Sequence, residues 1–295
     1  METKPLTIYT PTYNRASLLP RLYECLCAQT DARFVWLVVD DGSTDGTAAL
    51  VAAWQAEGRL DIQYLSKENG GVHTARDLAY DTIGTELLCG VDSDDRVAPD
   101  FVGHLLSLWE AKGGPAYLGI IAPVMTDDGA PLGPPFPELP ALSFQDLHFR
   151  YGCNGDQTIV VRPEVMRAIP HAPVTPGEKL VGEDYKWMQL PDAPFLLSRQ
   201  ADLYHSYLPD GYTQNARTLM LRNLHGAQAE AAVYIRHCRY FRPRIRAHIK
   251  YIICGLYLGE GGLVRRSPRP AATAALLPLG WLAYLIYRHK YGGRP

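Results

Sequence analysis

The sequence contains no Cys-x-x-Cys pair, and none of its six cysteines lies with histidines at a spacing typical of zinc sites. Three of the six lie inside apolar stretches, which is typical of reduced, buried thiols rather than of a disulfide framework. No repeat with a period of about 20–50 residues and no low-complexity tract is present, which argues against solenoids and propellers. The motifs G-x-x-x-x-G-K-[ST] and G-x-G-x-x-G are also absent, which excludes a P-loop and a Rossmann dinucleotide site.

Acidic residues are almost missing from residues 236–295, which carry twelve Lys or Arg against the single Glu260. This segment has a net charge of +11, although the whole chain has a net charge of −2. An acidic body joined to a basic tail indicates that the tail meets something anionic. The first residues lack the basic and apolar regions of a secretory signal, so we expect none here.

Strand-like and helix-like segments alternate along the first 110 residues. Predicted strands cover residues 6–10, 34–39, 60–65 and 86–91, and predicted helices cover residues 16–29, 47–57 and 72–82. The continuous apolar stretch over residues 34–39 is typical of a strand that helices cover on both faces. The alternation predicts an α/β fold with a Rossmann-like, mostly parallel sheet, whose ligands bind at the carboxyl ends of the strands. Further strands are expected at residues 117–123 and 156–162.

Acidic residues follow the fourth predicted strand, in the run Asp92-Ser93-Asp94-Asp95. Two carboxylates two positions apart, where a strand opens into a loop, can face one ligand. Carboxylate oxygens suit Mg²⁺ or Mn²⁺, and these ions suit a diphosphate. Acidic turns also follow strands in proteins without any metal, so this run alone leaves a purely structural role open.

Polar residues follow the other three strands as well. Tyr13 can stack on a nucleobase, and Asp41 can accept a hydrogen bond from a ring N–H. Gly70 and Gly71 permit close approach of the backbone, and Arg76 can neutralise phosphate. The four strand ends together predict a nucleotide site at one edge of the sheet.

Residues 6–101 resemble the nucleotide-binding half of family-2 glycosyltransferases of the GT-A fold, of the type that builds bacterial surface polysaccharides. The motifs, in order, are Pro-Thr-Tyr-Asn-Arg (11–15), Val-Asp-Asp-Gly-Ser-Thr-Asp (39–45), Glu-Asn-Gly-Gly (68–71) with Ala-Arg (75–76), and Asp-Ser-Asp-Asp (92–95). The later run Asp210-Gly211-Tyr212-Thr213 resembles a loop of such bacterial relatives.

The resemblance implies a role for each matching residue. Donor-binding residues are expected to be Pro11, Tyr13 and Asp41 around the nucleobase, Gly71 and Arg76 at the diphosphate, and Asp92 and Ser93 near the ribose or donor sugar. Asp94, with Asp92, would hold Mg²⁺ or Mn²⁺. Asp40 is expected to support the loop, and Asp95 is either a neighbour of the metal site or a helix cap.

The resemblance also implies a general base in the second half of the chain. Gly182-Glu183-Asp184-Tyr185-Lys186-Trp187 resembles the Glu-Asp segment that supplies it, which makes Asp184 the expected base and Glu183 the alternative or a positioning neighbour. Without the resemblance, two acids that favour a helix N-terminus by about 0.3–1 kcal/mol would explain the pair. Asp156 is expected at the donor sugar. His205 is either a metal ligand or a structural residue.

The C-terminal segments predict association with an anionic membrane surface. Predicted helices cover residues 217–237 and 244–258, and the second is basic with its isoleucines on one face. Residues 271–287 carry no charge but include Pro278 and Gly280. We expect this stretch to form a re-entrant or in-plane hairpin rather than a full span, with a buried core helix as the third possibility. Expected boundaries are 1–215 for the catalytic domain (halves 1–101 and 102–215), 216–258 for amphipathic helices and 259–295 for the basic link and apolar segment.

The expected activity is inverting, metal-assisted transfer of a sugar from a UDP-sugar to a hydroxyl of a glycan or lipid-linked glycan. It is expected at the cytoplasmic face of the membrane, with no nucleic acid partner. A sugar-nucleotide pyrophosphorylase is one alternative, but residues 10–15 do not form the Gly-rich basic loop that it needs. A non-catalytic relative that binds nucleotide sugars is the other, and it would be expected to have lost the acids at 92, 94 and 183–184.

Overall fold

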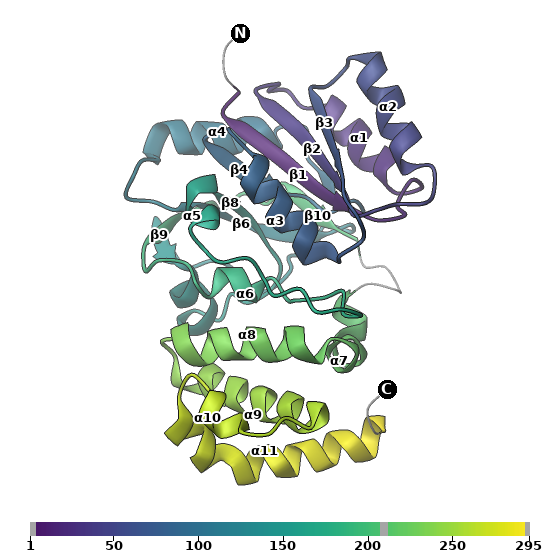
Figure 1. The fold of residues 1–295 in the computed structure, drawn as a ribbon. Coiled ribbons are helices and arrows are strands. Elements are labelled where there is room, and N and C mark those ends of the chain that lie inside the picture. The colour runs from purple at the N-terminus through teal and green to yellow at the C-terminus, as the bar shows by residue number, and fades with distance from the viewer. Residues whose placement is uncertain (1–3, 207–211, 293–295) are drawn as a thin grey trace. The chain divides into compact units, whose positions relative to one another are not determined.

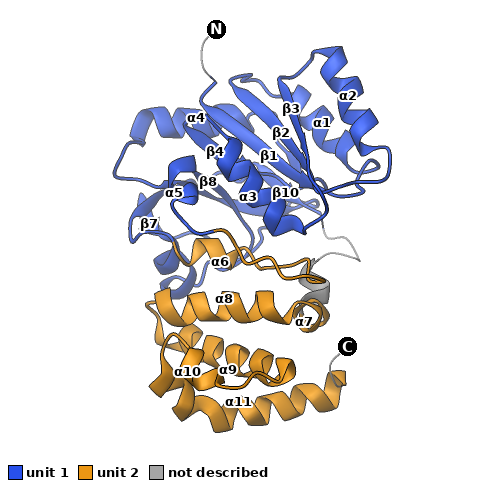
Figure 2. Cartoon of the chain, in the orientation of Figure 1, with its two compact units in different colours: residues 1–170, 190–207 blue, residues 171–189, 208–295 orange. Residues whose placement is uncertain are grey.

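The computed structural model describes residues 4–206 and 212–292, with the backbone alone for residues 212–216. Asp210 and Gly211 of the predicted loop lie outside the described residues. The chain divides into two compact units: unit 1 comprises residues 1–170 and 190–207, and unit 2 comprises residues 171–189 and 208–295 (Figure 2). The backbone therefore enters unit 2, returns to unit 1 and enters unit 2 again. Glu183 and Asp184 belong to unit 2, whereas the sequence placed them in one domain with the nucleotide motifs.

A curled, mostly parallel sheet forms the centre of unit 1 (Figure 1). Its strands are β1 (Leu6–Thr12), β2 (Phe34–Asp40), β3 (Ile62–Ser66), β4 (Leu87–Gly90), β5 (Arg96–Val97), β6 (Gly119–Thr126), β7 (Ala141–Ser143), β8 (Gln157–Val161), β9 (Pro194–Leu197) and β10 (Leu203–His205). The order is β3-β2-β1-β4-β8-β6-β10-β5, and β9 pairs with β6 and β7. The first four strands are parallel, and β8 runs antiparallel to β4 and β6. The predicted fold class is confirmed.

Helices cover both faces of this sheet. They are α1 (Leu19–Cys27), α2 (Thr47–Glu57), α3 (Val72–Thr82), α4 (Phe101–Lys112), α5 (Pro163–Arg167) and the short π-helix η1 (Asp146–Arg150). On one face the rings of Tyr23 (α1), Trp36 (β2) and Trp54 (α2) pack together in one cluster, in which Tyr23 stacks on Trp54 with 4.3 Å between the ring centroids. Neighbouring residues of a strand point to opposite faces of the sheet. On the other face, Tyr9 of β1 contacts Tyr80 of α3. Every residue of β1 and β2 is buried, as the apolar sequence of β2 predicts.

Unit 2 is helical apart from its loops. Its helices are α6 (Asp184–Trp187), α7 (Tyr212–Arg222), α8 (Leu224–His237), α9 (Phe241–Leu258), α10 (Leu263–Arg266) and α11 (Pro270–Tyr291). The single helix expected over residues 217–237 is wrong, because the chain breaks at Asn223. There the Asn223 side-chain oxygen accepts hydrogen bonds from the backbone N–H groups of Lys179 (2.7 Å) and Leu180 (3.0 Å), so the break fixes the segment that leads to α6.

The apolar face of α9 is already occupied within unit 2. Ile252 and Ile253 are buried, and they belong to two apolar clusters that α9 forms with α8 and α11. The prediction that this face lies on a membrane is therefore wrong. Its isoleucines are spaced for helix packing, a pattern that in sequence looks the same as a membrane-facing stripe.

The C-terminal helix α11 is continuous from Pro270 to Tyr291 and passes through Pro278 without a break, so the expected hairpin is wrong. The inner face of α11 packs closely on α9: a Cβ atom at Gly280 would lie 2.6 Å from the Ile252 side chain. Buried Thr273 is also hydrogen-bonded to His248 of α9 (2.8 Å). Among the described residues, α11 is the one helix long and apolar enough to cross a membrane.

Candidate active site

The carboxyl ends of the first three strands lie side by side, with Thr12 paired with Asp40 and Asp40 with Ser66. Asn14, which has a positive φ of 52°, links the loops that follow β1 and β2. Its backbone N–H donates to the Ser43 hydroxyl, and its side-chain oxygen accepts from the Thr44 N–H, both at 2.8 Å. The sequence analysis assigned no role to Asn14, although asparagine is one of the few residues that adopt this conformation readily.

The predicted nucleobase residues Pro11 and Tyr13 lie on the first of these strand ends. Pro11 is buried within β1, whereas Tyr13 leaves 46% of its surface exposed in the loop beyond. An exposed aromatic ring at the edge of a parallel sheet is available for stacking on a base. Tyr13 is thus accessible at the carboxyl end of β1, and its contact with a nucleobase stays a prediction.

Asp41 is buried and shapes the loop that precedes α3. Its Oδ1 accepts from the Lys67 ammonium (2.6 Å) and the Gly70 N–H (2.9 Å), and its Oδ2 accepts from the Gly71 N–H (2.7 Å). Gly71 has φ of 98°, a conformation that favours glycine. A carboxylate oxygen can accept two hydrogen bonds, and Oδ2 has one from the described residues. Asp41 thus supports the glycine loop, and its contact with a nucleobase stays a prediction.

Asp40 has the structural role that was predicted for it. Its carboxylate accepts from the Ser43 N–H (2.7 Å) and from the Tyr64 hydroxyl (2.5 Å), and the residue is almost fully buried. It therefore fixes the turn after β2 rather than facing solvent.

Two of the predicted donor residues meet at the end of β4. The guanidinium of Arg76, from α3, lies 3.6 Å from the carboxylate of Asp92. Asp92 and Asp94 are half-buried, whereas Ser93 is buried between them. Because Arg76 is largely enclosed (14% exposed) and Asp92 is not (46%), the cation is fixed and the carboxylate remains open to a ligand. Asp92 and Asp94 lie two positions apart in the loop after β4, and their joint contact with one ligand stays a prediction.

Asp92 and Asp94 fit a divalent cation that is held jointly by the protein and the donor. The part of the chain that the structure describes contains no group of three or more His, Cys, Asp or Glu placed to hold a metal. Mg²⁺ is commonly bound by only one or two carboxylates together with substrate phosphates and waters. Asp94, for which no hydrogen bond is seen among the described residues, together with Asp92 supplies that number of carboxylates.

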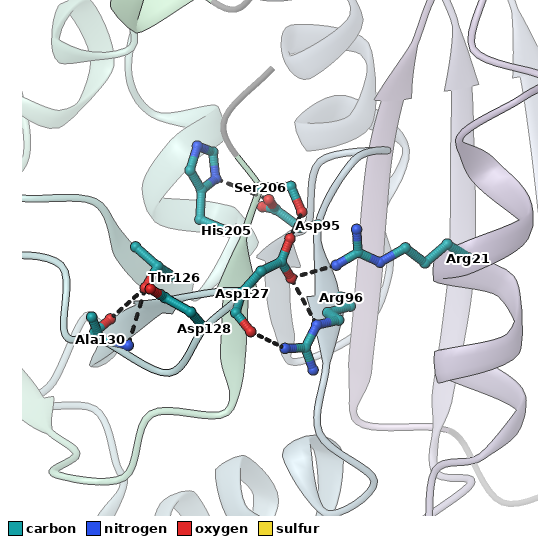
Figure 3. Close-up of polar contacts among 9 residues, drawn as sticks. All are labelled: Arg21, Asp95, Arg96, Thr126, Asp127, Asp128, Ala130, His205 and Ser206. Carbon is teal, nitrogen blue, oxygen red and sulfur yellow. Dashed lines mark hydrogen bonds and ion pairs between the residues drawn. The ribbon is translucent and has the colours of Figure 1, made fainter. Parts of the chain in front are cut away.

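Asp95, which follows Asp94 in the chain, forms an ion pair of 2.9 Å with His205 of β10 (Figure 3). Burial raises the pKa of the Asp95 carboxyl, and the bond to Asp95 raises the pKa of His205, to which the carboxylate of exposed Asp156 also contributes. Asp156 thus lies within electrostatic reach of His205. A protonated imidazole cannot ligate a metal, so coordination by His205 would require loss of this proton. Of the two roles predicted for Asp95, that of a helix cap is wrong, because β5 follows it and the next helix, α4, begins only at Phe101.

A second polar cluster, which the sequence analysis missed, holds the strand that carries His205 (Figure 3). The Asp127 carboxylate accepts from Arg21 of α1 (2.5 Å), Arg96 of β5 (2.8 Å) and the Ser206 hydroxyl. Partial burial tends to raise the pKa of Asp127, but these hydrogen bonds outweigh it and lower the pKa. The cluster joins α1, β5 and the end of β10 around one charge. Its members are spread over 186 positions without a motif, so no local signal could have identified them.

The expected base lies in unit 2, where the structure gives it definite partners. Asp184 is the first residue of α6, is half-buried, and accepts a hydrogen bond of 2.5 Å from the Tyr234 hydroxyl of α8. Burial raises the pKa of Asp184 to about 6, and the neighbouring Glu230 carboxylate acts in the same direction. Glu183 is exposed. Of the two acids, Asp184 is the one whose surroundings favour proton exchange near neutral pH.

A contact set of the Ser-His-Asp kind also occurs in unit 1, away from the residues above. His104 of α4 is hydrogen-bonded to Asp202 through one ring nitrogen and lies 3.2 Å from the Ser198 hydroxyl through the other. Ser198 is only 3% exposed, and its oxygen also accepts from the Gln200 N–H. A nucleophile must reach its substrate, so this set is structural: it holds the turn between β9 and β10 on α4.

Two solved structures illustrate the fold that this chain shares with others. The S. aureus TarS fragment 1–349 in complex with UDP-GlcNAc superimposes with a TM-score of 0.62 at 15% identity, over 97% of this chain and 91% of that one. The mannosyltransferase PcManGT from Pyrobaculum calidifontis, in complex with GDP-Man and Mn²⁺, gives a TM-score of 0.55 at 18% identity, over 97% and 82%. The fold of this chain is thus that of GT-A enzymes.

The sequence assigns the chain to a family within that fold. The profile of the family described as "Glycosyl transferase family 2" matches residues 7–154, which is half of the chain. The chain belongs to this family. Its motifs at residues 11–15, 39–45, 68–76 and 92–95 all lie within the matched region.

Curated relatives match a smaller part. One is the undecaprenyl-phosphate 4-deoxy-4-formamido-L-arabinose transferase of Sodalis glossinidius (strain morsitans), 32% identical over 112 residues, which are 37% of this chain and 34% of the relative. Another is the validoxylamine A glucosyltransferase of Streptomyces hygroscopicus subsp. jinggangensis (strain 5008), 38% identical over 115 residues, 38% of this chain and 26% of that protein. The chain therefore matches about a third or less of the length of these relatives.

Proposed function

We propose that this protein transfers a sugar from a nucleoside diphosphate sugar, a UDP-sugar in the first instance, to an acceptor hydroxyl. The observation that carries the proposal is the meeting of Arg76 and Asp92 beside Asp94 at the carboxyl edge of the sheet. A cation and two carboxylates at one opening match a diphosphate that is joined to a sugar. Membership of glycosyl transferase family 2 and the UDP-GlcNAc complex of the TarS fragment support the same donor class.

The donor is bound by the loops of unit 1. Tyr13 stacks on the nucleobase, Asp41 accepts a base N–H through Oδ2, and the Gly71 loop lets the backbone approach the diphosphate. Arg76 neutralises the diphosphate, and Asp92 and Ser93 bind the ribose or donor sugar. Asp156 contacts a donor-sugar hydroxyl. Because Asp41 also hydrogen-bonds the glycine loop, nucleobase recognition and loop shape depend on the same side chain.

Asp94, together with Asp92, holds Mg²⁺ or Mn²⁺ when the donor binds. The ion supplies positive charge at the diphosphate, which makes the nucleoside diphosphate a better leaving group. Arg76, a largely enclosed side chain of α3, acts on the same leaving group. The Mn²⁺ named in the PcManGT complex supports a divalent ion in this fold.

Asp184 is the general base. The reaction is a single in-line displacement: the acceptor oxygen forms a bond to the anomeric carbon while the bond from that carbon to the diphosphate oxygen breaks. The acceptor proton passes to Asp184, and the electron pair of the broken bond leaves with the diphosphate. The configuration at the anomeric carbon is inverted. The raised pKa of Asp184 suits this role, since a base with a pKa near the working pH accepts a proton effectively and is still ionised.

The acceptor is a lipid-linked glycan or a lipid phosphate at the cytoplasmic face of a bacterial membrane, in surface polysaccharide assembly. The undecaprenyl-phosphate transferase among the relatives supports this acceptor class. The outer face of α11 supports the location. Exposed side chains of α11 from residue 271 to residue 286 are all uncharged, and the largest are Leu279, Trp281, Leu282 and Ile286, each about half exposed.

We place α11 in the plane of the membrane interface rather than across the bilayer. Gly280 and Thr273 bind its inner face to α9, and a full span would require these contacts to separate. Basic residues lie at both ends of the helix: Arg265, Arg266 and Arg269 before it, and Arg288 and Lys290 in its last turn. An apolar face flanked by cations matches an interface with anionic headgroups.

A screen of nucleotide sugars tests the donor assignment. The protein is heated with UDP-, GDP- and dTDP-sugars, each with and without Mn²⁺, and its melting temperature is recorded. We expect one nucleotide class to raise the melting temperature, and Mn²⁺ to increase the shift. Release of the nucleoside diphosphate from that donor, with and without acceptor lipids, then separates an enzyme from a non-catalytic binder. A protein that no nucleotide sugar stabilises would contradict the proposal.

A further inference from the structure

Two helices that the sequence analysis assigned only to the tail supply the surroundings of Asp184. Asp184 begins α6, which lies against α8 within unit 2 (Figure 2). Tyr234 and Glu230, both on α8, are four positions apart and therefore share one face of that helix. Tyr234 donates its hydroxyl hydrogen to Asp184 Oδ2 at 2.5 Å. Lys250 of α9 donates to Glu230 Oε1 at 2.9 Å.

Glu230 also limits the position of the chain just before Asp184. A Cβ atom at Gly182 would lie 2.3 Å from Glu230 Oε2, so the Glu230 carboxylate lies close against the backbone at this position. The Glu230 and Lys250 side chains are 16% and 32% exposed, which makes their ion pair largely enclosed. The segment that carries Asp184 therefore contacts α8 through the Asp184 side chain and lies close to α8 at Gly182.

Among the described residues, three charged side chains act on Asp184. Glu183 precedes it and is exposed, Glu230 lies on α8, and Lys250 on α9 pairs with Glu230. Two carboxylates, those of Glu183 and Glu230, thus act on Asp184, whereas the cation of Lys250 is paired with Glu230. The Tyr234 hydroxyl is the group that donates a hydrogen bond directly to its carboxylate.

We propose that Tyr234 is a positioning residue for the general base: its hydroxyl binds one oxygen of Asp184 and leaves the other for the acceptor proton, while the Glu230–Lys250 pair sets the charge around it. This inference rests on the proposed role of Asp184. A hydrogen bond to the charged form of a carboxylate favours ionisation, whereas a second carboxylate nearby opposes it. Tyr234 and Glu230 therefore act on Asp184 in opposite directions.

Because Tyr234 and Glu230 affect the ionisation of Asp184 in opposite directions, replacing each of them provides a test whose result general loss of structure would not reproduce. In Tyr234→Phe the ionised carboxylate loses a donor, so we expect the acid limb of the kcat–pH profile to move up by about one pH unit. We also expect kcat at neutral pH to fall about tenfold with the donor KM unchanged, since the carboxylate is less well oriented. In Glu230→Gln one negative charge is removed, so the acid limb should move to lower pH.

Tyr257→Phe is the matched control, because Tyr257 is also a tyrosine of this helical unit and bonds to the Gly292 carbonyl instead. Tyr257→Phe should change neither the position of the acid limb of the kcat–pH profile nor kcat. Melting temperatures of all variants show that they fold. If Asp184→Asn is inactive but the acid limbs of Tyr234→Phe and Glu230→Gln both stay at the wild-type pH, the base assignment stands and the positioning role is overturned. If Asp184→Asn keeps its kcat, the base assignment itself is wrong and the role of Tyr234 falls with it.

Discussion

The two units place their functional residues by different means. In unit 1, Tyr13, Asp41, Gly71 and Asp92 follow four successive parallel strands, and the sheet aligns them because all four strands end at one edge. In unit 2, Asp184 depends on Tyr234, Glu230 and Lys250, which come from two other helices. Sheet register thus builds the proposed donor site, and helix packing builds the proposed base. The comparison predicts that binding and chemistry can be separated by mutation.

The largest effect is expected at Asp94, the carboxylate of unit 1 for which we propose a metal-binding role. Asp94→Ala should abolish sugar transfer and the Mn²⁺-dependent part of donor binding, because the diphosphate loses the charge that the ion supplies. The fold should persist, since no hydrogen bond to Asp94 is seen among the described residues. Asp61→Ala, which removes a surface carboxylate paired with Lys4, is the control. Full activity of the Asp94 variant in a chelator would show that no metal is held there.

In unit 2, Asp184→Asn should leave donor affinity within a few-fold and lower kcat by about 10²–10⁴, the usual effect of losing a positioned base. Donor binding is measured by the Mn²⁺-dependent thermal shift and kcat by release of nucleoside diphosphate. Glu183→Gln is the matched variant, because it removes the adjacent, exposed carboxylate. If Glu183→Gln is crippled and Asp184→Asn is not, the two assignments are reversed.

A third comparison sets the outer face of α11 against an exposed helix of unit 1. Leu282→Glu with Ile286→Glu should lower binding to phosphatidylglycerol-containing vesicles at least about tenfold at high salt, since burial of each side chain contributes about 1.5–3 kcal/mol. Ala52→Glu with Ala56→Glu adds equal charge at equal spacing on α2 and should leave high-salt binding unchanged. Sedimentation with vesicles measures both. Equal behaviour of the two double variants would remove α11 from the membrane interface. Truncation before Ala271 is a poor test, because it would expose Ile252.

The proton affinity of Asp184 predicts the pH dependence. A base must be ionised, so kcat should fall about tenfold per pH unit as the pH drops below about 6, where burial and Glu230 place the pKa of Asp184. A profile that stays flat to pH 5 would exclude Asp184 as the group that titrates.

A smaller effect on stability follows from the same pKa. Because it is raised in the folded protein, the folded state binds this proton more tightly than the unfolded state, and stability increases as the pH falls through about 6. At pH 7 the ionised carboxylate destabilises the fold. Asp184→Asn should therefore raise the free energy of unfolding by about 1–2 kcal/mol at pH 7 and by less at pH 5. Denaturant titration at both pH values tests this, and a destabilised variant would contradict it.

The sequence predicted the donor edge better than the rest because its signals are local. Asp41 and Asp92 each follow an apolar strand within two residues, so the end of the strand locates the residue. Tyr234 and Asp184 are 50 positions apart, and no spacing relates them. Where the predictions were wrong, one sequence pattern fitted two environments. The spacing of the α9 isoleucines, including Ile252, suits a membrane-facing surface and helix packing equally, and in this protein it serves helix packing. Pro278 was taken for a break, but a proline can lie within a helix at the cost of a hydrogen bond, and here α11 is held by its contacts with α9.

The return of the chain to unit 1 has a consequence for how the protein is made. Strand β10 lies between β6 and β5, yet it is synthesised more than 100 residues after β5. Until it arrives, Asp95 lacks His205 and the edge formed by β5 has no neighbour. Pairings so distant along the chain close slowly. The nucleotide half can therefore collapse early during synthesis. The part of the sheet beside Asp95 is completed only after the segment bearing Asp184 has already been made, so a separately expressed fragment that ends at residue 170 would contain an incomplete sheet.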